Sequence, residues 1–340
     1  MNTLIGDIAA LMSGKALAVL IVALVLCFSW LGDARAEAAS SPSPRSWSNL
    51  LQRLQDDGLY TKTLAQGIQG LPPPSPDPMG RKIKELYTAR FARPHPLPDA
   101  PKRKPAYFYP NVVTPENAAA CRAFFNSHRP AFEQMKKAYG VPGDIAVALL
   151  FVETRLGASL GKNRVFYTLA SMAESRLPEH LGAWLHEIDQ PQDRMEWLRE
   201  TMLRRSNWAY RELAAFIRYA EKNGIDPFAV PGSIYGAFGI CQFMPSSVEP
   251  YAADGNGDGL IDLFTLEDAL TSLASYLVKN GWKSGISHTG RHAVLRRYNR
   301  ADIYANTILA LADMVRGEPV GRPIVTARRP APPSSGTRAF

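Results

Sequence analysis

The chain has 340 residues, of which 46% are hydrophobic and 21% charged, and its formal net charge is +8. This composition is typical of a globular protein and excludes a chain that is disordered throughout. Basic residues are spread along the sequence, with one small cluster at Pro101 to Pro105, and no nucleic-acid-binding motif accompanies them. The charge therefore favours an anionic envelope polymer or membrane surface as the partner, and no nucleic acid.

Residues 1–36 have the pattern of an export signal. Lys15 precedes a long apolar run, and Ala34 and Ala36 supply the small residues of a secretory cleavage site. We expect cleavage after Ala36 and a periplasmic location. An uncleaved membrane anchor is the alternative, because the apolar run approaches the length of a bilayer span. Cleavage leaves the formal charge at +8, since it removes two basic and two acidic side chains.

Two cysteines remain after this cleavage, Cys121 and Cys241. In an oxidising compartment they are able to form a disulfide, and two buried free thiols are the alternative.

The region before Thr114 combines short helices with proline-rich chain. Residues 37–46 are predicted to be a linker, after which helical spacing begins at Trp47 and Gly58 separates two short helices. Prolines dominate residues 71–105 on both sides of a helical segment around Ile83 to Phe91. Because proline disfavours helices and central strands, we expect 71–105 to wrap over the surface of a domain, with a flexible linker as the alternative.

From Thr114 onward the pattern is mainly helical. Thr114 and Pro115 form a helix start, Gly140 and Pro142 a helix stop, and Asp144 a cap for the next helix. Further helices are expected twice between residues 194 and 227, once over 266–282 and once over 301–316. The tail, residues 317–340, is basic and rich in proline and serine and is predicted to be disordered.

The helix that begins near Asp144 carries a single acidic residue near its end, Glu153. An apolar stripe follows helical spacing beside it, so the carboxyl group borders a buried face. Burial raises the pKa of a carboxyl group, which would make Glu153 a general acid near neutral pH. A structural ion pair with Arg155 is the alternative. The stripe consists of Ile145, Leu149, Val152 and Leu156.

Three further segments carry groups that are able to bind ligands. In the first, Gly232, Gly236 and Gly239 permit close backbone approach and Gln242 adds an amide, although such a loop also serves packing alone. The last contains Tyr298, Asn299 and Tyr304, whose aromatic faces and amide suit sugar rings and N-acetyl groups. Core or capping positions are equally consistent with these three residues.

Between these segments, Asp254 to Asp262 matches the opening of an EF-hand calcium loop. Side-chain oxygens stand at positions 1, 3 and 5, glycine at 6 and a backbone carbonyl at 7. Position 12 is Thr265, which has no carboxylate, so Asp268 or Glu267 would have to close the shell, with Asp262 acting directly or through water. We expect a structural calcium ion, and a metal-free turn is the alternative. The matching residues are Asp254, Asn256, Asp258, Gly259 and Leu260.

These segments, in this order, resemble the membrane-bound lytic transglycosylase B family of peptidoglycan-cleaving enzymes. The similarity runs from about Trp47 to Arg316 and is densest in "VALLFVETRLG", "GAFGICQFMPSS", "DGNGDGLIDL" and "YNRADIYA". It implies a mainly α fold for residues 47–316, with a lysozyme-like helical core, a small β element and an EF-hand-like calcium loop. It also implies peptidoglycan strands as the substrate, Ca²⁺ as a structural ion and no organic cofactor, and it identifies no envelope-protein partner.

The resemblance implies a role for each matching residue. Glu153 corresponds to the sole catalytic acid/base of a carbon–oxygen lyase that leaves 1,6-anhydro ends. The substrate-binding positions are Ser233, Gln242, Tyr276, Tyr298, Asn299 and Tyr304, and the calcium positions are Asp254, Asn256, Asp258, Leu260 and Asp268.

The chain departs from the family pattern at two places, of which the first concerns substrate contacts. Relatives tend to have a "YPRR"-like stretch where this chain has "ESRLPEH", so Arg176 or His180 would have to replace it, and Cys241 stands where a small residue is expected. A lysozyme-type hydrolase on the same scaffold and a non-catalytic wall-binding protein are the alternative functions. Hydrolases ordinarily use two carboxylates, whereas a lytic enzyme needs one.

Overall fold

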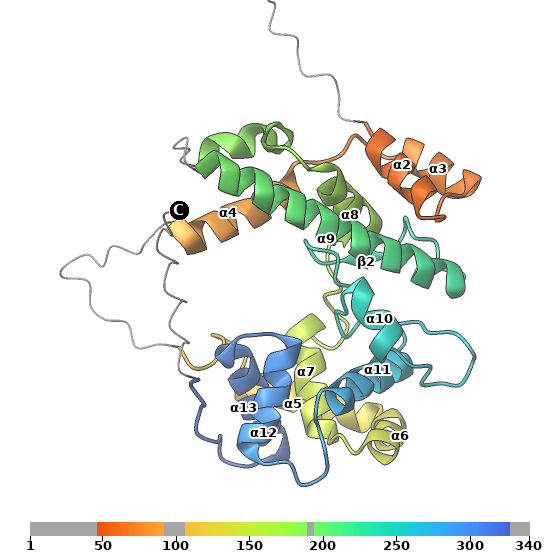
Figure 1. The fold of residues 1–340 in the computed structure, drawn as a ribbon. Helices are drawn as coiled ribbons and strands as arrows, with labels where there is room; N and C mark the ends of the chain where they lie inside the picture. The colour runs from red at the N-terminus through yellow and green to blue at the C-terminus, as the bar shows by residue number, and fades with distance from the viewer. Residues whose placement is uncertain (1–45, 92–105, 189–193, 327–340) are drawn as a thin grey trace, which may run out of the picture. The chain divides into compact units, whose positions relative to one another are not determined.

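A computed structural model describes residues 46–91, 106–188 and 194–326 of the chain (Figure 1). The predicted export signal and its cleavage position lie outside these residues. The first described helices confirm the sequence prediction of two short helices separated at Gly58, followed by a helical segment among prolines. The helices before the first strand are α2 (Ser48–Asp56), α3 (Lys62–Gln69), α4 (Asp77–Phe91), α5 (Pro115–Ser127), α6 (Arg129–Tyr139) and α7 (Gly143–Thr154).

The second part of the chain is also mainly helical, with two very short strands. β1 (Asn163–Arg164) and β2 (Pro231–Gly232) pair antiparallel and form the small β element. The remaining elements are α8 (Val165–Glu174), the 3-10 segment η1 (Pro178–Glu187), α9 (Met195–Lys222), α10 (Pro245–Tyr251), α11 (Leu266–Lys279), α12 (His288–Tyr298) and α13 (Asp302–Arg316). Nowhere in the described ranges is a helix both long enough and apolar enough to cross a bilayer.

Capping residues determine several helix boundaries. The Thr114 hydroxyl accepts a hydrogen bond from the backbone N–H of Asn117 (3.2 Å), which confirms the predicted start of α5. Thr61 accepts in the same way from Leu64 (3.1 Å) at the start of α3. Gly140 ends α6 in the left-handed conformation (φ 68°), where glycine carries no side-chain penalty.

Helix α7 is buried on all sides, and not only along the predicted apolar stripe. Every residue from Ile145 to Phe151 is buried, because α7 contacts α5, α6, α11 and α13. Of the predicted stripe, Val152 and Leu156 are only partly buried. A helix that is apolar all round belongs in a protein core. Glu153 therefore lies where this buried helix approaches its end.

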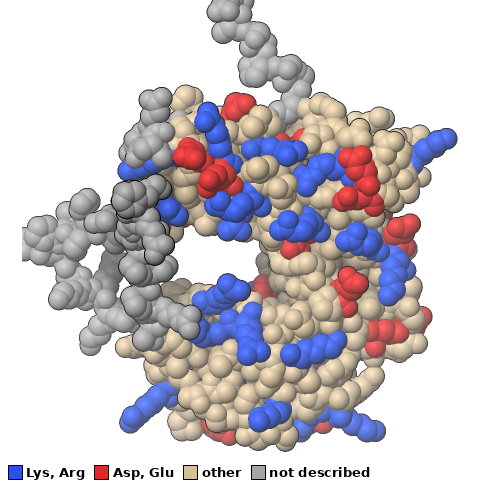
Figure 2. Space-filling model, viewed as in Figure 1, with Lys and Arg blue, Asp and Glu red and all other residues tan. Residues whose placement is uncertain are grey.

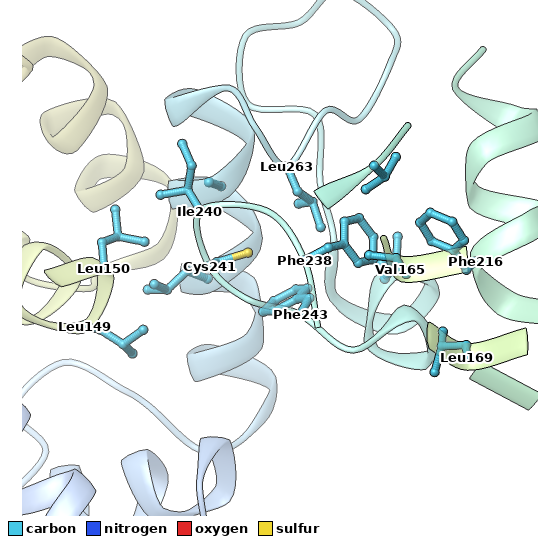
Figure 3. Packing of buried hydrophobic residues seen from close by; sticks show 14 of the residues in the cluster. Leu149, Leu150, Val165, Leu169, Phe216, Phe238, Ile240, Cys241, Phe243 and Leu263 are labelled. Atoms are coloured by element: carbon cyan, nitrogen blue, oxygen red, sulfur yellow. The ribbon is translucent and has the colours of Figure 1, made fainter. Parts of the chain in front are cut away.

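The core continues from α7 towards the loop that follows β2. Figure 3 shows Leu149 and Leu150 of α7 on one side of Cys241 and Phe243, with Val165 and Leu169 of α8 on the other. Both Cys121 and Cys241 are free thiols and buried, so the disulfide alternative is not realised in the structure.

The β element requires glycine at one position. Gly161, just before β1, has φ +95°, and a Cβ atom there would lie 2.0 Å from the carbonyl oxygen of Gly232. Any other residue would push β2 away. This close contact fixes the start of the glycine-rich segment that carries Ser233 and Gln242.

The predicted break between residues 194 and 227 does not occur. A single 28-residue helix, α9, replaces the two expected helices. The physical reason is that residues 195–222 contain neither glycine nor proline and bury a continuous face against α8 and α10.

The predicted disorder of the tail does not hold for residues 317–326. Residues 317–326 lie against α13, where Gly321, Ile324 and Thr326 donate backbone hydrogen bonds to Asp313, Asn306 and Asp302. Side chains of α13 therefore order a segment whose own composition favours disorder. Residues 327–340 lie outside the described residues.

Candidate active site

Glu153 lies in the last turn of α7 and is largely removed from solvent. Burial raises the pKa of its carboxyl group to about 7, and a hydrogen bond from Tyr304 acts in the opposite direction. The Tyr304 hydroxyl donates to Oε1 of Glu153 at 2.5 Å. A pKa near neutrality suits a group that gives a proton in one step of a reaction and takes one in another.

Two tyrosines from the ends of α12 and α13 form one wall of the site. The ring of Tyr298 stacks on that of Tyr304, with centroids 6.3 Å apart and planes 11° from parallel. Burial, followed by the charge of Glu153, raises the pKa of Tyr304 far above its usual value. Tyr304 therefore stays protonated and remains a hydrogen-bond donor throughout the pH range in which Glu153 titrates.

Glu153 forms no ion pair with Arg155 in the described part of the chain. The Arg155 guanidinium lies instead over the ring of Phe151, 4.5 Å from its centroid. The chain also turns away at this point, because Arg155 and Leu156 both have positive φ values (52° and 61°). Three consecutive left-handed residues, counting Gly157 (φ 90°), follow Thr154 and end α7.

Thr154 connects the end of α7 to the glycine-rich segment. Its hydroxyl is buried, donates to the carbonyl of Ile240 (2.9 Å) and accepts from the N–H of Gly157 (3.0 Å). The sequence analysis did not identify Thr154. The signal that could have identified it is a small polar side chain directly after the acid in an otherwise apolar helix. Thr154 fixes Gln242, two residues beyond Ile240, relative to Glu153.

Gln242 lies in a tight hairpin formed by residues 238–243. Phe238 and Phe243 exchange two backbone hydrogen bonds of 3.0 Å, and Gln242 between them adopts φ 50°. The Gln242 amide nitrogen donates to the Gly239 carbonyl (2.9 Å), which leaves its own carbonyl oxygen as an acceptor for a ligand. A left-handed conformation at a non-glycine residue is common at functional sites.

The hairpin is also connected to the acidic loop. The backbone N–H of Ile240 donates to the carbonyl of Leu263 (2.8 Å), which lies between the predicted calcium positions Leu260 and Asp268. A Cβ atom at Gly239 would lie 2.5 Å from that of Leu263, so only glycine permits this approach. The order of the acidic loop and the position of Gln242 are therefore coupled.

Ser233 holds a turn in front of the hairpin. Its hydroxyl oxygen accepts hydrogen bonds from the N–H groups of Tyr235 (3.3 Å) and Ala237 (2.9 Å), so its proton remains for donation to a ligand. The Tyr235 hydroxyl in turn donates to Glu85 of α4 (2.5 Å). This contact joins the glycine-rich segment to α4.

The other predicted substrate residues lie at different depths. Tyr298 donates its hydroxyl to the Cys241 carbonyl, and Tyr276 stacks edge-on against Tyr298 with centroids 4.8 Å apart. The Tyr276 hydroxyl donates a hydrogen bond to the backbone carbonyl of Arg297 (2.7 Å). Asn299 is exposed at the end of α12, and within the described residues its side chain forms no hydrogen bond with this group. The structure thus brings Tyr276, Tyr298 and Tyr304 into one cluster with Glu153.

Tyr109 is a second residue that sequence reasoning missed. It precedes α5, and its backbone N–H donates to the Thr307 hydroxyl of α13 (2.9 Å). Burial, and then the nearby charge of Glu153, raise the pKa of Tyr109. No local pattern marks it, because long-range packing alone brings it near the acid.

Of the expected replacements for the family's "YPRR" stretch, Arg176 contacts α2 and His180 contacts the end of α8. The Arg176 guanidinium donates to Asn49 (3.0 Å), and Nδ1 of His180 lies 2.9 Å from the Glu174 carbonyl. These contacts hold the segment after α8 in place.

The acidic loop is organised by hydrogen bonds to its carboxylates. Asp254 accepts from the N–H groups of Gly257 (2.6 Å) and Gly259 (2.8 Å), and these bonds, led by Gly259, lower its pKa. Asp268 is fully buried and accepts from Gly255 (2.7 Å) and Asp262 (2.7 Å) with its two different oxygens. In the ranges that the structure describes, no three His, Cys, Asp or Glu side chains are grouped as metal ligands.

Comparisons with known proteins identify relatives of this chain. A family model described as "Transglycosylase SLT domain" matches residues 43–291. Membrane-bound lytic murein transglycosylase B of Escherichia coli (strain K12) is 34% identical over 173 residues, which are 51% of this chain and 41% of that relative. The chain thus spans about two fifths of the length of this curated relative.

Two solved structures show the same fold. Escherichia coli lytic transglycosylase Slt35, in complex with calcium, has a TM-score of 0.59 and 22% identity, covering 79% of this chain and 92% of that chain. Pseudomonas aeruginosa SltB3, in complex with NAG-anhNAM-pentapeptide, has a TM-score of 0.56 and 17% identity, covering 80% of each chain. These likenesses confirm the predicted mainly helical, lysozyme-like fold.

Proposed function

We propose, from the premise that this chain belongs to the transglycosylase SLT domain family, that it is a peptidoglycan lytic transglycosylase. It would cleave the bond between N-acetylmuramic acid and N-acetylglucosamine without water and leave a 1,6-anhydro end. The observation that carries this proposal is Glu153, a partly buried carboxyl group whose pKa is raised to about 7. Across residues 46–91, 106–188 and 194–326, no hydrogen bond or ion pair joins a second carboxylate to Glu153 or to the tyrosines around it.

One carboxyl group is sufficient for this reaction. Protonated Glu153 gives its proton to the oxygen of the leaving N-acetylglucosamine as the glycosidic bond breaks. The resulting carboxylate then takes the proton of the 6-hydroxyl of the muramic residue, and that oxygen bonds to the anomeric carbon. Glu153 ends protonated, as it began. Ser233, Gln242 and Asn299 would orient the sugar, and Tyr276, Tyr298 and Tyr304 would form the wall behind it.

Mass spectrometry of digested peptidoglycan tests the proposal. A lytic enzyme releases fragments with 1,6-anhydro ends, which are one water lighter than the reducing ends of a hydrolase. Reducing ends would instead identify a lysozyme-type hydrolase. A folded protein that binds the wall and releases nothing would identify a binding protein.

The pH profile depends on Tyr304. The hydrogen bond from Tyr304 lowers the pKa of Glu153, so Tyr304→Phe should raise that pKa. Because the protonated acid starts the reaction, wild-type activity should fall as pH rises through about 7, and the falling limb should move to higher pH in the variant. Rates of muropeptide release between pH 5 and 9 measure this shift. An unmoved limb would contradict the role of Tyr304.

We further propose that the acidic loop binds a structural calcium ion. The ligands would be side-chain oxygens of Asp254, Asn256 and Asp258, the carbonyl of Leu260, and Asp268. These hard oxygen donors suit calcium, and carboxylate oxygens that accept one N–H keep a second lone pair for a cation. The calcium complex of Slt35 supports the same idea by analogy. Calcium bound here would fix Leu263 and, through it, the hairpin of Gln242.

Thermal unfolding with and without calcium tests this site. Added calcium should raise the Tm of the metal-free wild type, and Asp258→Ala should abolish that rise, because Asp258 is exposed and serves the loop alone. Asp226→Ala, at another exposed acid, is the matched control and should keep the rise. An unchanged wild-type Tm on calcium addition would contradict the proposal.

The proposed substrate also explains the basic charge of +8, which would attract the protein to an anionic envelope. We place the enzyme in the periplasm on this ground and on the pattern of residues 1–36.

A further inference from the structure

A cavity of about 560 Å³ lies between α4 and α9, apart from the group around Glu153. Its wall on α9 is a single stripe of the helix surface, since the residues follow spacings of three and four. α4 supplies the opposite wall through Leu86, Ala89 and Arg90. We name this cavity the Arg–Trp groove, and its charged and aromatic residues are Arg90, Trp197, Arg204, Arg205, Trp208 and Arg211.

The arginines of the Arg–Trp groove carry an excess of positive charge. Arg204 pairs with Glu200 at 3.6 Å, and both side chains are exposed. No ion pair to Arg90, Arg205 or Arg211 occurs in the part of the chain that the structure describes. Figure 2 shows several Lys and Arg side chains over the surface that α9 forms. An anionic ligand would therefore gain hydrogen bonds from groups that already lie together.

The two tryptophans have different surroundings. Trp197 packs against Phe91 and Tyr87, with centroids 5.1 Å and 5.9 Å apart, and so forms a fixed wall. Trp208 is partly exposed, and in the described residues no ring stacks on it and no partner accepts its indole N–H. A flat apolar face with a free donor at its edge suits a sugar ring.

We propose that the Arg–Trp groove is a second, non-catalytic binding site for peptidoglycan. Sugar rings would stack on Trp208 while carboxylates of the peptide stems bind the arginines. This inference rests on the proposed function, because that function identifies peptidoglycan as the polymer. The concave form of the groove favours a chain ligand over a flat bilayer. A second contact keeps the enzyme on the polymer between cleavage events by raising the effective concentration of glycan at Glu153.

Co-sedimentation with insoluble peptidoglycan tests the groove. All variants are made in the Glu153→Gln background, so that the polymer stays intact and the assay measures binding alone. Arg205→Ala with Arg211→Ala should weaken binding by about tenfold, and Trp208→Ala by about fivefold, as expected for lost charge-assisted and stacking contacts. The matched control is Arg218→Ala with Lys222→Ala, which removes the same charge from exposed positions on the same helix and should bind as the parent does.

The outcomes separate this site from the proposed function. Equal binding by the groove variants and the control would overturn the groove. Equal weakening by the control would also overturn it, because general charge would then explain binding. Loss of binding to phosphatidylglycerol vesicles, with peptidoglycan binding retained, would overturn it in favour of an anionic lipid. A wild-type protein that releases no muropeptides would overturn the proposed lytic activity. The comparison of peptidoglycan binding between the groove variants and the control would still hold. Cleavage of short soluble glycan fragments should be the same in wild type and Arg205→Ala/Arg211→Ala, because no residue that lines the groove belongs to the group around Glu153.

Discussion

Glu153→Gln should reduce release of soluble muropeptides by at least about 100-fold, the lower end of the range for general acid/base catalysis. Glutamine keeps the size and the hydrogen-bonding oxygen of the side chain but neither gives nor takes the proton. Because the same carboxyl group serves both steps, the substitution removes the acid of the first step and the base of the second. Quantification of released muropeptides by chromatography measures the loss.

The stability of this variant provides the control. The pKa of Glu153 is raised from its usual 4.5 to about 7, so ionisation costs the folded state stability as pH rises from about 4.5 to about 7. Glu153→Gln removes this cost and should raise the unfolding free energy at pH 8 by about 1–3 kcal/mol relative to wild type, with little change at pH 4. A well-folded variant that releases muropeptides at the wild-type rate would remove Glu153 from the mechanism.

Asp268→Ala should lower the free energy of unfolding by about 2–4 kcal/mol even without calcium. The fully buried carboxylate accepts backbone hydrogen bonds from Gly255 and Asp262 at 2.7 Å, and from Asn256 at 3.4 Å. Alanine leaves these N–H groups without an acceptor in a site that water reaches poorly. Urea unfolding in the presence of a chelator measures the effect.

Asp258→Ala is the comparison for Asp268→Ala. Asp258 is exposed and accepts chiefly from the N–H of Leu260 (2.8 Å), so its loss should change the metal-free stability by less than about 1 kcal/mol. If Asp268→Ala does not fold, Asp268→Asn keeps one acceptor oxygen and should give a smaller loss. Equal, small effects of the substitutions at 258 and 268 would contradict a scaffold role for Asp268.

Local signals in the sequence predicted most helix positions. Thr114 with Pro115 and Gly140 with Pro142 act within one helical turn, so their effect is readable without tertiary structure. The single helix α9 was missed, although the absence of glycine and proline from 195–222 was visible. The ordered segment 317–326 was not predictable, because side chains of α13 hold it and its own composition does not.

The candidate site was also predictable only where local signals in the sequence mark it. The acid at the end of an apolar helix was visible, and the family resemblance identified Tyr298 and Tyr304 beside it. Helix α7 is buried on all sides because four other helices surround it, which the stripe did not indicate. The bond from Thr154 to the Ile240 carbonyl and the approach of Tyr109 depend on chain segments far apart in sequence. Only packing creates such contacts.

The central claim is that one partly buried carboxyl group, Glu153, exchanges its proton near neutral pH. Titration of the side-chain carboxyl resonances of ¹³C-labelled glutamate by NMR tests this claim directly, with Glu153→Gln identifying the resonance of interest. We predict a midpoint of about 7 for the resonance that the variant lacks. A midpoint near the ordinary value of 4.5 would show that Glu153 is ionised at neutral pH, and would contradict its role as the acid that begins the reaction.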